Sequence, residues 1–87
     1  MEKKFWVKRM KECVGGMSMN AGRAFVQAET IDEATELLYQ LNLEMAEDGT
    51  ADSYLYLVGD VWGPYDTEDI AMSADLSLPV PILFRCS

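Results

Sequence analysis

The chain has 87 residues, with fifteen Asp and Glu against seven Lys and Arg, no histidine, and a formal net charge of −8. This length suits a single domain near the lower limit for one hydrophobic core, and an apolar content of 49% excludes a disordered tail. The early apolar run Phe5-Trp6-Val7 is too short for a signal sequence or a membrane span. We therefore expect one cytoplasmic domain over residues 1–87.

The charge is distributed unevenly along the chain. Residues 1–11 carry five cations against Glu2, a balance of +4, whereas residues 12–87 carry fourteen carboxylates against Arg23 and Arg85, a balance of −12. A field of this sign repels nucleic acid and anionic membranes and attracts basic protein surfaces. Outside the short basic arm at the start of the chain, we expect no direct binding to nucleic acid or membrane.

The first third of the chain is typical of two strands. Aromatic and β-branched residues predict a strand over about 3–12, and RAFVQA predicts a second, short strand over 23–28. The segment GGMSMNAG (15–22) contains three glycines and Asn20, which favours a long, mobile hairpin loop.

Residues 30–49 contain the clearest helical signal. Thr30 and Glu33 have the spacing of a capping box, and Gly49 suits the end of the helix. Five apolar residues recur on one side at helical spacing: Ala34, Leu37, Leu38, Leu41 and Met45. The opposite side carries Glu33, Glu36, Gln40, Glu44 and Glu47, and the helix has no Lys or Arg to pair with them. Like charges at this spacing repel each other.

The segment SYLYLVGDVW (53–62) alternates in the manner of a strand. Gly63-Pro64 is expected to end that strand, because proline cannot donate a ladder hydrogen bond. Asp66 is expected to cap a short helix over about 67–76, with Glu68 and Asp69 in its first turn.

Burial in this second helix is expected at Ile70 and Ala74, with Leu76 nearby. The two prolines of LPVPILF then favour an extended entry into a final strand at 82–84. The predicted order is β-β-α-β-α-β. Right-handed strand-helix-strand connections would place both helices on one face of a four-stranded mixed sheet, which is a two-layer α/β (α+β) sandwich.

The sequence lacks the parts of most catalytic and metal sites. Two cysteines without histidine cannot supply four zinc ligands, and no histidine is available as a base near neutral pH. Cys13 and Cys86 are either two reduced thiols, which we expect in the absence of a secretory signal, or a disulfide that joins the two ends of the chain. We expect no enzymatic activity and no cofactor.

The acidic segment GDVWGPYDTEDI (59–70) raises the question of a divalent metal. An EF-hand loop that begins at Asp60 fails, because the fifth position is Pro64 and the twelfth is Ala71. Helix capping is the expected role of these carboxylates, and an irregular site built from Asp60, Asp66 and Asp69 is the alternative. The glycines of 15–22 lack the Gly-Lys-Ser/Thr of a phosphate-binding loop. YLYLVGDVW lacks the signature of an RNA-binding sheet, despite its tyrosines.

The remaining feature is the acidic surface. It is either a solvated face or an interface for a basic partner, and the second interpretation predicts a set of contact residues. These are Glu33, Glu36, Gln40, Glu44, Glu47, Asp66, Glu68, Asp69, Trp62 and Tyr65. The two aromatic residues belong to this surface if they are exposed, and to the architecture of the turn if they are buried.

An acidic single domain of this size, with an unpaired stripe of glutamates, resembles small inhibitor proteins of phages and mobile elements, notably anti-CRISPR proteins. The resemblance lies in size and charge over the whole chain. It implies a non-enzymatic inhibitor that occupies a basic, nucleic-acid-binding surface of a partner complex.

A second resemblance is local. YLVGDVWGPYDTEDIA is similar to the strand, Gly-Pro-aromatic turn and acidic helix start of peptidoglycan-binding SPOR domains. It implies a binding module. A purely structural, self-associating module is a further alternative, which leaves a homodimer open. A small cytosolic enzyme or metal-dependent subunit that uses carboxylates is the other alternative.

Overall fold

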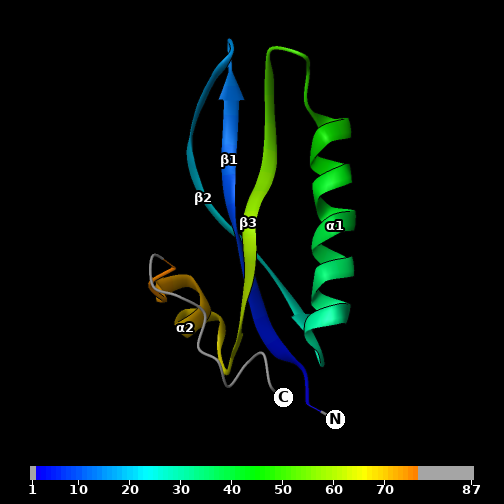
Figure 1. The fold of residues 1–87 in the computed structure, drawn as a ribbon, viewed down its shortest axis with the longest axis vertical. Coiled ribbons are helices and arrows are strands. Elements are labelled where there is room, and N and C mark those ends of the chain that lie inside the picture. Colours follow the sequence, from blue (N-terminus) through cyan, green and yellow to red (C-terminus); the bar gives the residue numbers. More distant parts are fainter. Residues whose placement is uncertain (1, 77–87) are drawn as a thin grey trace.

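The computed structural model describes residues 2–76, which form a three-stranded antiparallel sheet and two helices (Figure 1). The elements are β1 (Lys4–Val14), β2 (Met17–Ala28), α1 (Ile31–Asp48), β3 (Ser53–Tyr65) and α2 (Glu68–Ser73). The strand order is β2-β1-β3, and β1 pairs antiparallel with both neighbours. The α+β class is confirmed, whereas the mixed pairing is wrong for these strands. The predicted strand at 82–84 lies outside the described residues.

The connection between the first two strands is a tight turn, so the predicted long loop over 15–22 is wrong. Val14 already pairs with Met17, and both glycines between them have positive φ, 58° at Gly15 and 83° at Gly16. Two successive positive φ values match the twist of a two-residue hairpin turn. Because the turn is this short, strand β2 begins directly after it, at Met17.

Helix α1 begins and ends as the sequence predicts. The Thr30 side chain accepts a hydrogen bond from the Glu33 backbone N–H at 3.2 Å, and the helix ends before Gly49. A Cβ atom at Gly49 would lie 2.6 Å from the Tyr54 Cβ, so glycine lets the chain turn close to β3. Halfway along the helix, Asn42 Oδ1 accepts from the Leu57 backbone N–H at 2.8 Å. This bond ties α1 to strand β3.

Strand β3 continues through Gly63-Pro64, where the sequence led us to expect its end. Tyr65 still pairs with Phe5 of β1, and the Gly63-Pro64 peptide is cis. Strand β3 lies at an edge of the described sheet, and an edge strand tolerates a residue without an N–H. The prediction failed because the sequence does not reveal which strand is the edge.

Helix α2 is shorter than predicted, and its cap is one residue later. Thr67, rather than Asp66, accepts from the Ile70 backbone N–H, at 3.1 Å. The buried residues also differ from the prediction, because Ile70 is 47% exposed and Ala71 is fully buried. Leu76, which was expected to lie near this helix, is buried.

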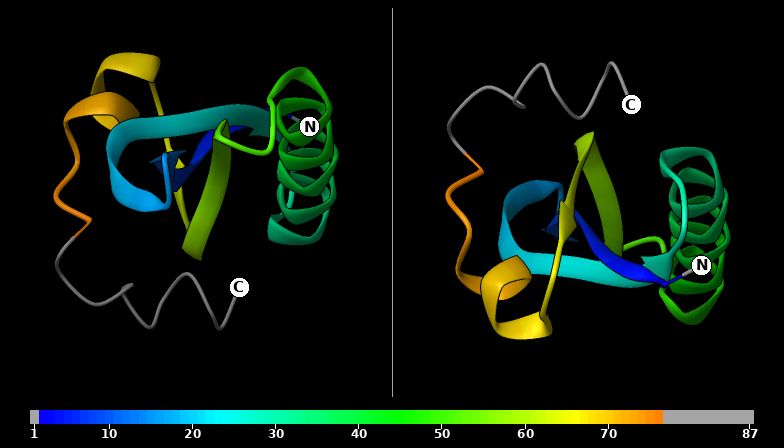
Figure 2. Two further views of the ribbon diagram at one scale, coloured as in Figure 1. Left: turned by 90° about the horizontal axis from the view of Figure 1, so that it is seen from above. Right: turned by 90° about the horizontal axis from the view of Figure 1, so that it is seen from below.

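The two helices pack against opposite sides of the sheet, which corrects the expectation that both lie on one face (Figure 2). Successive strand residues point to opposite faces. Trp6 accordingly packs with Ala34 of α1, while Val7 packs with Trp62 and with Ala71 of α2. The molecule therefore has two small apolar cores, one on each side of β1.

Cys13 is a free, half-buried thiol on β1. Its proposed partner in a disulfide, Cys86, lies outside the described residues. The expectation of two reduced thiols therefore stays a prediction, and the disulfide stays its alternative.

Candidate functional site

Helix α1 presents its acidic residues on the side that faces away from the sheet. Ala34 and Leu38 are its buried residues, and successive residues are rotated by about 100° around a helix. The opposite side carries Glu33, Glu36, Gln40, Glu44 and Glu47, here called the acidic face. All five are exposed except Glu33, which is half-buried. The structure thus places this predicted set together, along one helix.

The carboxylates of the acidic face have no cationic partner within the described chain. Helix α1 has no basic residue in its last turn, and none of its carboxylates forms an ion pair with any of residues 2–76. The side-chain contact within the face joins Gln40 Nε2 to Glu36 Oε1 at 3.2 Å. Like charges three and four residues apart destabilise a helix slightly, so the folded state retains an uncompensated repulsion.

Apolar side chains flank the acidic face. Tyr39 is 57% exposed and Leu43 is 42% exposed, and their spacing of four residues puts them on one flank of the helix. On the other flank Leu37, predicted to join the core, is 39% exposed. Sequence reasoning missed Tyr39 and Leu43 as candidate contact residues, although both fall outside the apolar pattern that marks the buried side. Exposed apolar and aromatic groups bordered by polar ones match the apolar core and polar rim of a typical protein interface.

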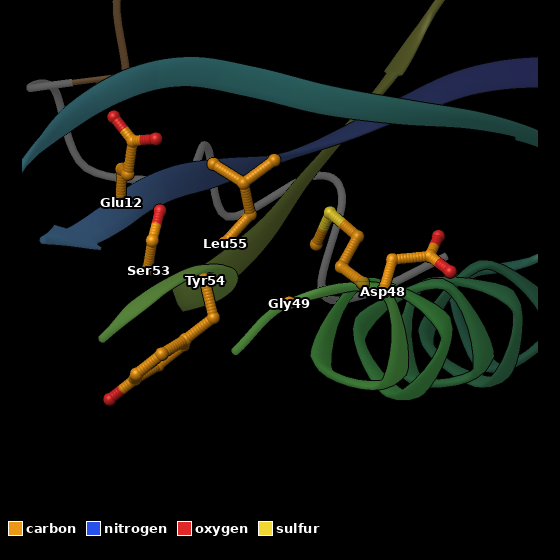
Figure 3. Close-up of a pocket in the computed structure, with 7 residues that line it drawn as sticks. Glu12, Asp48, Gly49, Ser53, Tyr54 and Leu55 are labelled. Carbon is orange, nitrogen blue, oxygen red and sulfur yellow. The ribbon is translucent and has the colours of Figure 1, made fainter. Parts of the chain in front are cut away.

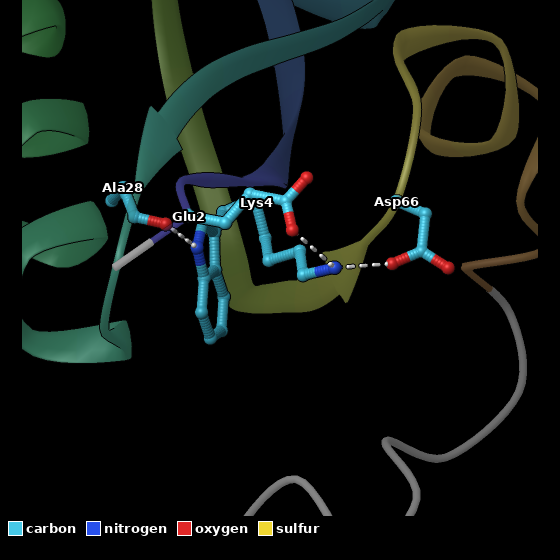
Figure 4. Close-up of polar contacts among 5 residues, drawn as sticks. Glu2, Lys4, Ala28 and Asp66 are labelled. Atoms are coloured by element: carbon cyan, nitrogen blue, oxygen red, sulfur yellow. Dashed lines mark hydrogen bonds and ion pairs between the residues drawn. The ribbon is translucent and has the colours of Figure 1, made fainter.

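The predicted carboxylates near α2 lie away from the acidic face, on the other side of the sheet. Glu68 and Asp69 are exposed in the first turn of α2. Asp66 accepts a hydrogen bond from Lys4 Nζ at 2.7 Å, while Glu2 lies 4.0 Å from the same atom (Figure 4). The hydrogen bond to Asp66 raises the pKa of Lys4. The structure therefore divides the predicted contact residues between two surfaces.

Trp62 and Tyr65 belong to the architecture of the turn. Trp62 is 8% exposed and packs beside Val7, and Tyr65 is half-buried against the same cluster. Burial disfavours the phenolate and raises the pKa of Tyr65, while the charge of Arg23 acts in the opposite direction. Of the two alternatives for these aromatic residues, burial supports the architectural one.

A second small site lies where the end of α1 meets the sheet. A cavity of about 250 Å³ opens between α1, β1 and β3 (Figure 3). Its lining consists of Glu12, Met45, Asp48, Gly49, Ser53, Tyr54 and Leu55. The Tyr54 hydroxyl donates a hydrogen bond to the sulfur of the neighbouring Cys13, and this bond raises the pKa of that tyrosine. Glu12 and Asp48 give this cavity an acidic rim.

The carboxylates of the described chain do not gather as a metal site. Within residues 2–76, no group of three or more His, Cys, Asp or Glu is arranged to hold a metal ion. Asp60 is on β3, and Asp66 contacts Lys4 instead. The residues described here also include no helix that is long and apolar enough to cross a bilayer.

Two arginines act in a way that sequence reasoning missed. Arg23 Nη1 donates to the Ala71 carbonyl oxygen at 3.0 Å and to that of Ala74 at 2.7 Å. Arg9 donates to the Leu76 carbonyl oxygen, and its guanidinium lies 5.9 Å from the centre of the Trp62 ring. Both side chains extend from the sheet to the segment at the end of α2. Each arginine is about fifty or more residues away in the sequence from the carbonyl groups that it contacts. No local sequence signal marks such contacts.

Comparison with protein-family models, with curated proteins and with solved structures found no match.

Proposed function

We propose that the protein is a non-enzymatic binding protein that acts in the cytoplasm and uses the acidic face of α1 to occupy a basic surface of a partner protein. The observation that carries this proposal is the combination of uncompensated carboxylates with the exposed Tyr39 and Leu43 on one helix. The unpaired charge steers the encounter, and burial of the two apolar side chains supplies most of the binding free energy.

The partner surface proposed is one that otherwise binds nucleic acid. Such surfaces collect Lys and Arg because they neutralise phosphates. Helix α1 has 18 residues, and at 1.5 Å per residue the acidic face from Glu33 to Glu47 extends over about 21 Å, comparable with a short stretch of nucleic-acid backbone. A rigid helix with this charge competes for the same cations without being a nucleic acid. This mode of action is the one implied by the resemblance to anti-CRISPR inhibitors.

The test reverses charge on the acidic face and compares partner binding. In Glu36→Lys/Glu44→Lys, both exposed side chains change sign, and we expect affinity for a partner captured from lysate of the source cells to fall by about tenfold or more. The matched control is Asp52→Lys/Asp60→Lys, which makes the same change in net charge at exposed positions outside α1. Binding of the wild type should weaken from about 50 to about 500 mM salt, as screening predicts.

The apolar contribution is tested separately with Tyr39→Ala. This variant leaves every charge in place, so we expect a faster dissociation rate and little change in the salt dependence of association. If the charge-reversed variant and its control bind equally well, or if binding is the same at all salt concentrations, the acidic face is not the interface.

A further inference from the structure

The side of the sheet that carries α2 has a hollow lined by cations. Its volume is about 420 Å³. The polar residues that line it are Arg9 and Lys11 from β1 and Asn20 and Arg23 from β2. The apolar lining comes from Met10, Val58 and Leu76. We call this feature the cationic hollow.

Strand pairing places the three cations next to one another. Arg9 lies directly opposite Arg23 across the β1–β2 ladder, and Lys11 lies opposite Asn20. Between these two pairs β1 has one residue and β2 has two, Ala21 and Gly22, so β2 is irregular at this point. Gly22 has a φ of +94°, which accommodates the irregularity. Residues two apart on a strand share a face, so Arg9 and Lys11 lie on one side of β1.

The two guanidinium groups are held in place by contacts that use only some of their hydrogen-bond donors. Arg23 uses Nη1 for the Ala71 and Ala74 carbonyls, and Arg9 uses Nη2 for the Leu76 carbonyl while its guanidinium lies near the face of Trp62. A guanidinium has five N–H donors in a fixed plane, so each arginine retains several. Their positions are therefore fixed before any ligand arrives.

The cations of the hollow lack a carboxylate partner in the described structure. None of Arg9, Lys11 and Arg23 forms an ion pair with an Asp or Glu among residues 2–76. The whole chain has fifteen carboxylates for seven cations. Like charges directly opposite each other across a ladder are unfavourable, so the Arg9–Arg23 pair costs stability unless an anion lies between them.

We propose that the cationic hollow binds a phosphate monoester group. At neutral pH such a group carries a charge between about −1.5 and −2 and three acceptor oxygens, which suits two planar arginine forks and one lysine. The apolar side chains of Val58 and Leu76 contact the organic part of the same molecule. This site lies across the sheet from the acidic face and does not rest on the proposed function.

The test measures binding of phosphate to the full chain and compares two lysine variants. In a phosphate-free and sulfate-free buffer, titration with inorganic phosphate should shift the backbone amide resonances of Arg9, Lys11 and Arg23. Sodium chloride at equal ionic strength should not. Lys11→Gln removes a side chain for which the described structure shows no hydrogen bond or ion pair, so the fold is preserved. We expect its phosphate affinity to fall by about tenfold.

The matched control is Lys8→Gln, the same change on the same strand. Lys8 lies one residue from Arg9 and therefore on the other side of β1. Phosphoserine and adenosine 5′-monophosphate separate an amino-acid source of the phosphate from a nucleoside source, and tighter binding of either one than of inorganic phosphate supports the proposal. Equal shifts with phosphate and chloride, or equal loss of affinity in the two lysine variants, would overturn it.

Discussion

At Gly63 the backbone passes so close to the ring of Trp6 that a side chain has no room. A Cβ atom there would lie 2.8 Å from Trp6 Cε3 and 3.1 Å from the Phe5 carbonyl oxygen. The ring cannot move away easily, because Trp6 Nε1 donates to the Ala28 carbonyl oxygen at 3.0 Å (Figure 4). Gly63 is therefore required by packing as well as by its φ of +151°.

We predict that Gly63→Ala lowers the free energy of unfolding by about 3 kcal/mol, from backbone strain and overpacking together. The control is Gly59→Ala, which also has positive φ, +81°, but has no neighbouring atom within 4 Å of the added Cβ. Its loss should be about 1 kcal/mol. Urea unfolding measures both values. Equal losses would show that the Trp6 ring gives way and that packing does not require a glycine at position 63.

The half-buried phenol of Tyr65 should make the stability of the protein depend on pH. Its pKa is raised above 10.0 by burial, so the folded state holds the proton more tightly than the unfolded state does. This stability is fully present below the unfolded pKa of 10.0 and is lost as pH rises through the folded pKa. Between about pH 9 and about pH 11, the free energy of unfolding should fall less steeply in Tyr65→Phe than in the wild type.

The control for this pH dependence is Tyr39→Phe, since the Tyr39 ring is 57% exposed. That variant removes the same hydroxyl group from an exposed position. Urea unfolding at both pH values is the measurement, and identical slopes for all three proteins would contradict a role for the buried phenol.

The cap of α2 shows how far residue-level prediction extends. The sequence correctly placed a capped helix start after the Gly-Pro pair, but it favoured Asp66 over Thr67. Asp66 instead contacts Lys4, sixty-two residues away. Local spacing cannot show a contact of that range, so the choice between two adjacent capping residues was decided by tertiary structure.

Helix α2 depends on an arginine of strand β2. This helix has only six residues, which is too short to be stable alone. Its last turn also has no basic residue that could interact with the helix dipole. The bonds from Arg23 to the Ala71 and Ala74 carbonyls satisfy acceptors at its C-terminal end and place a positive charge at the negative end of the helix dipole.

We predict that Arg23→Met, which keeps an apolar stem, lowers the local stability of α2 by about 2 kcal/mol. Hydrogen exchange at the Ala71 amide, which donates to the Thr67 carbonyl oxygen, reports this loss, and the amides of α1 should be unaffected. Lys8→Met is the control, since Lys8 lies on the other side of β1. Uniform acceleration of exchange across the sheet and both helices would mean that Arg23 supports the whole fold rather than α2.

The type of an element was predictable where its sequence pattern was long. The predicted bounds were wrong where a glycine can serve either in a loop or within a strand pair. The 18 residues of α1 carry a cap, an apolar side and a terminal glycine that agree with one another. Segment 15–22 was assigned to a loop because of its glycines. In the structure, two of these glycines make a tight turn and the third accommodates an irregular strand pairing. Composition alone does not distinguish these uses.

The placement of the two helices was the main error in the predicted architecture. The right-handed crossover rule applies to α1, which connects the outer strands β2 and β3 on either side of β1. It does not constrain α2 within the described chain, where no strand follows that helix. Val7 and Trp62 face away from α1, so α1 cannot bury them. Helix α2 packs against them instead. The candidate interface on α1 was predictable because it depends on one helix, whereas the cationic hollow depends on the pairing of two strands.

The two apolar cores also give the molecule two built-in optical reporters. Trp6 is 4% exposed and lies on the α1 side of the sheet, while Trp62 is 8% exposed and lies on the α2 side next to Arg9. The chain has no other tryptophan. A change in indole emission can therefore be assigned to one side of the protein by replacing either ring with phenylalanine. Binding at the acidic face of α1 and binding at the cationic hollow can then be followed separately in solution, without any added label.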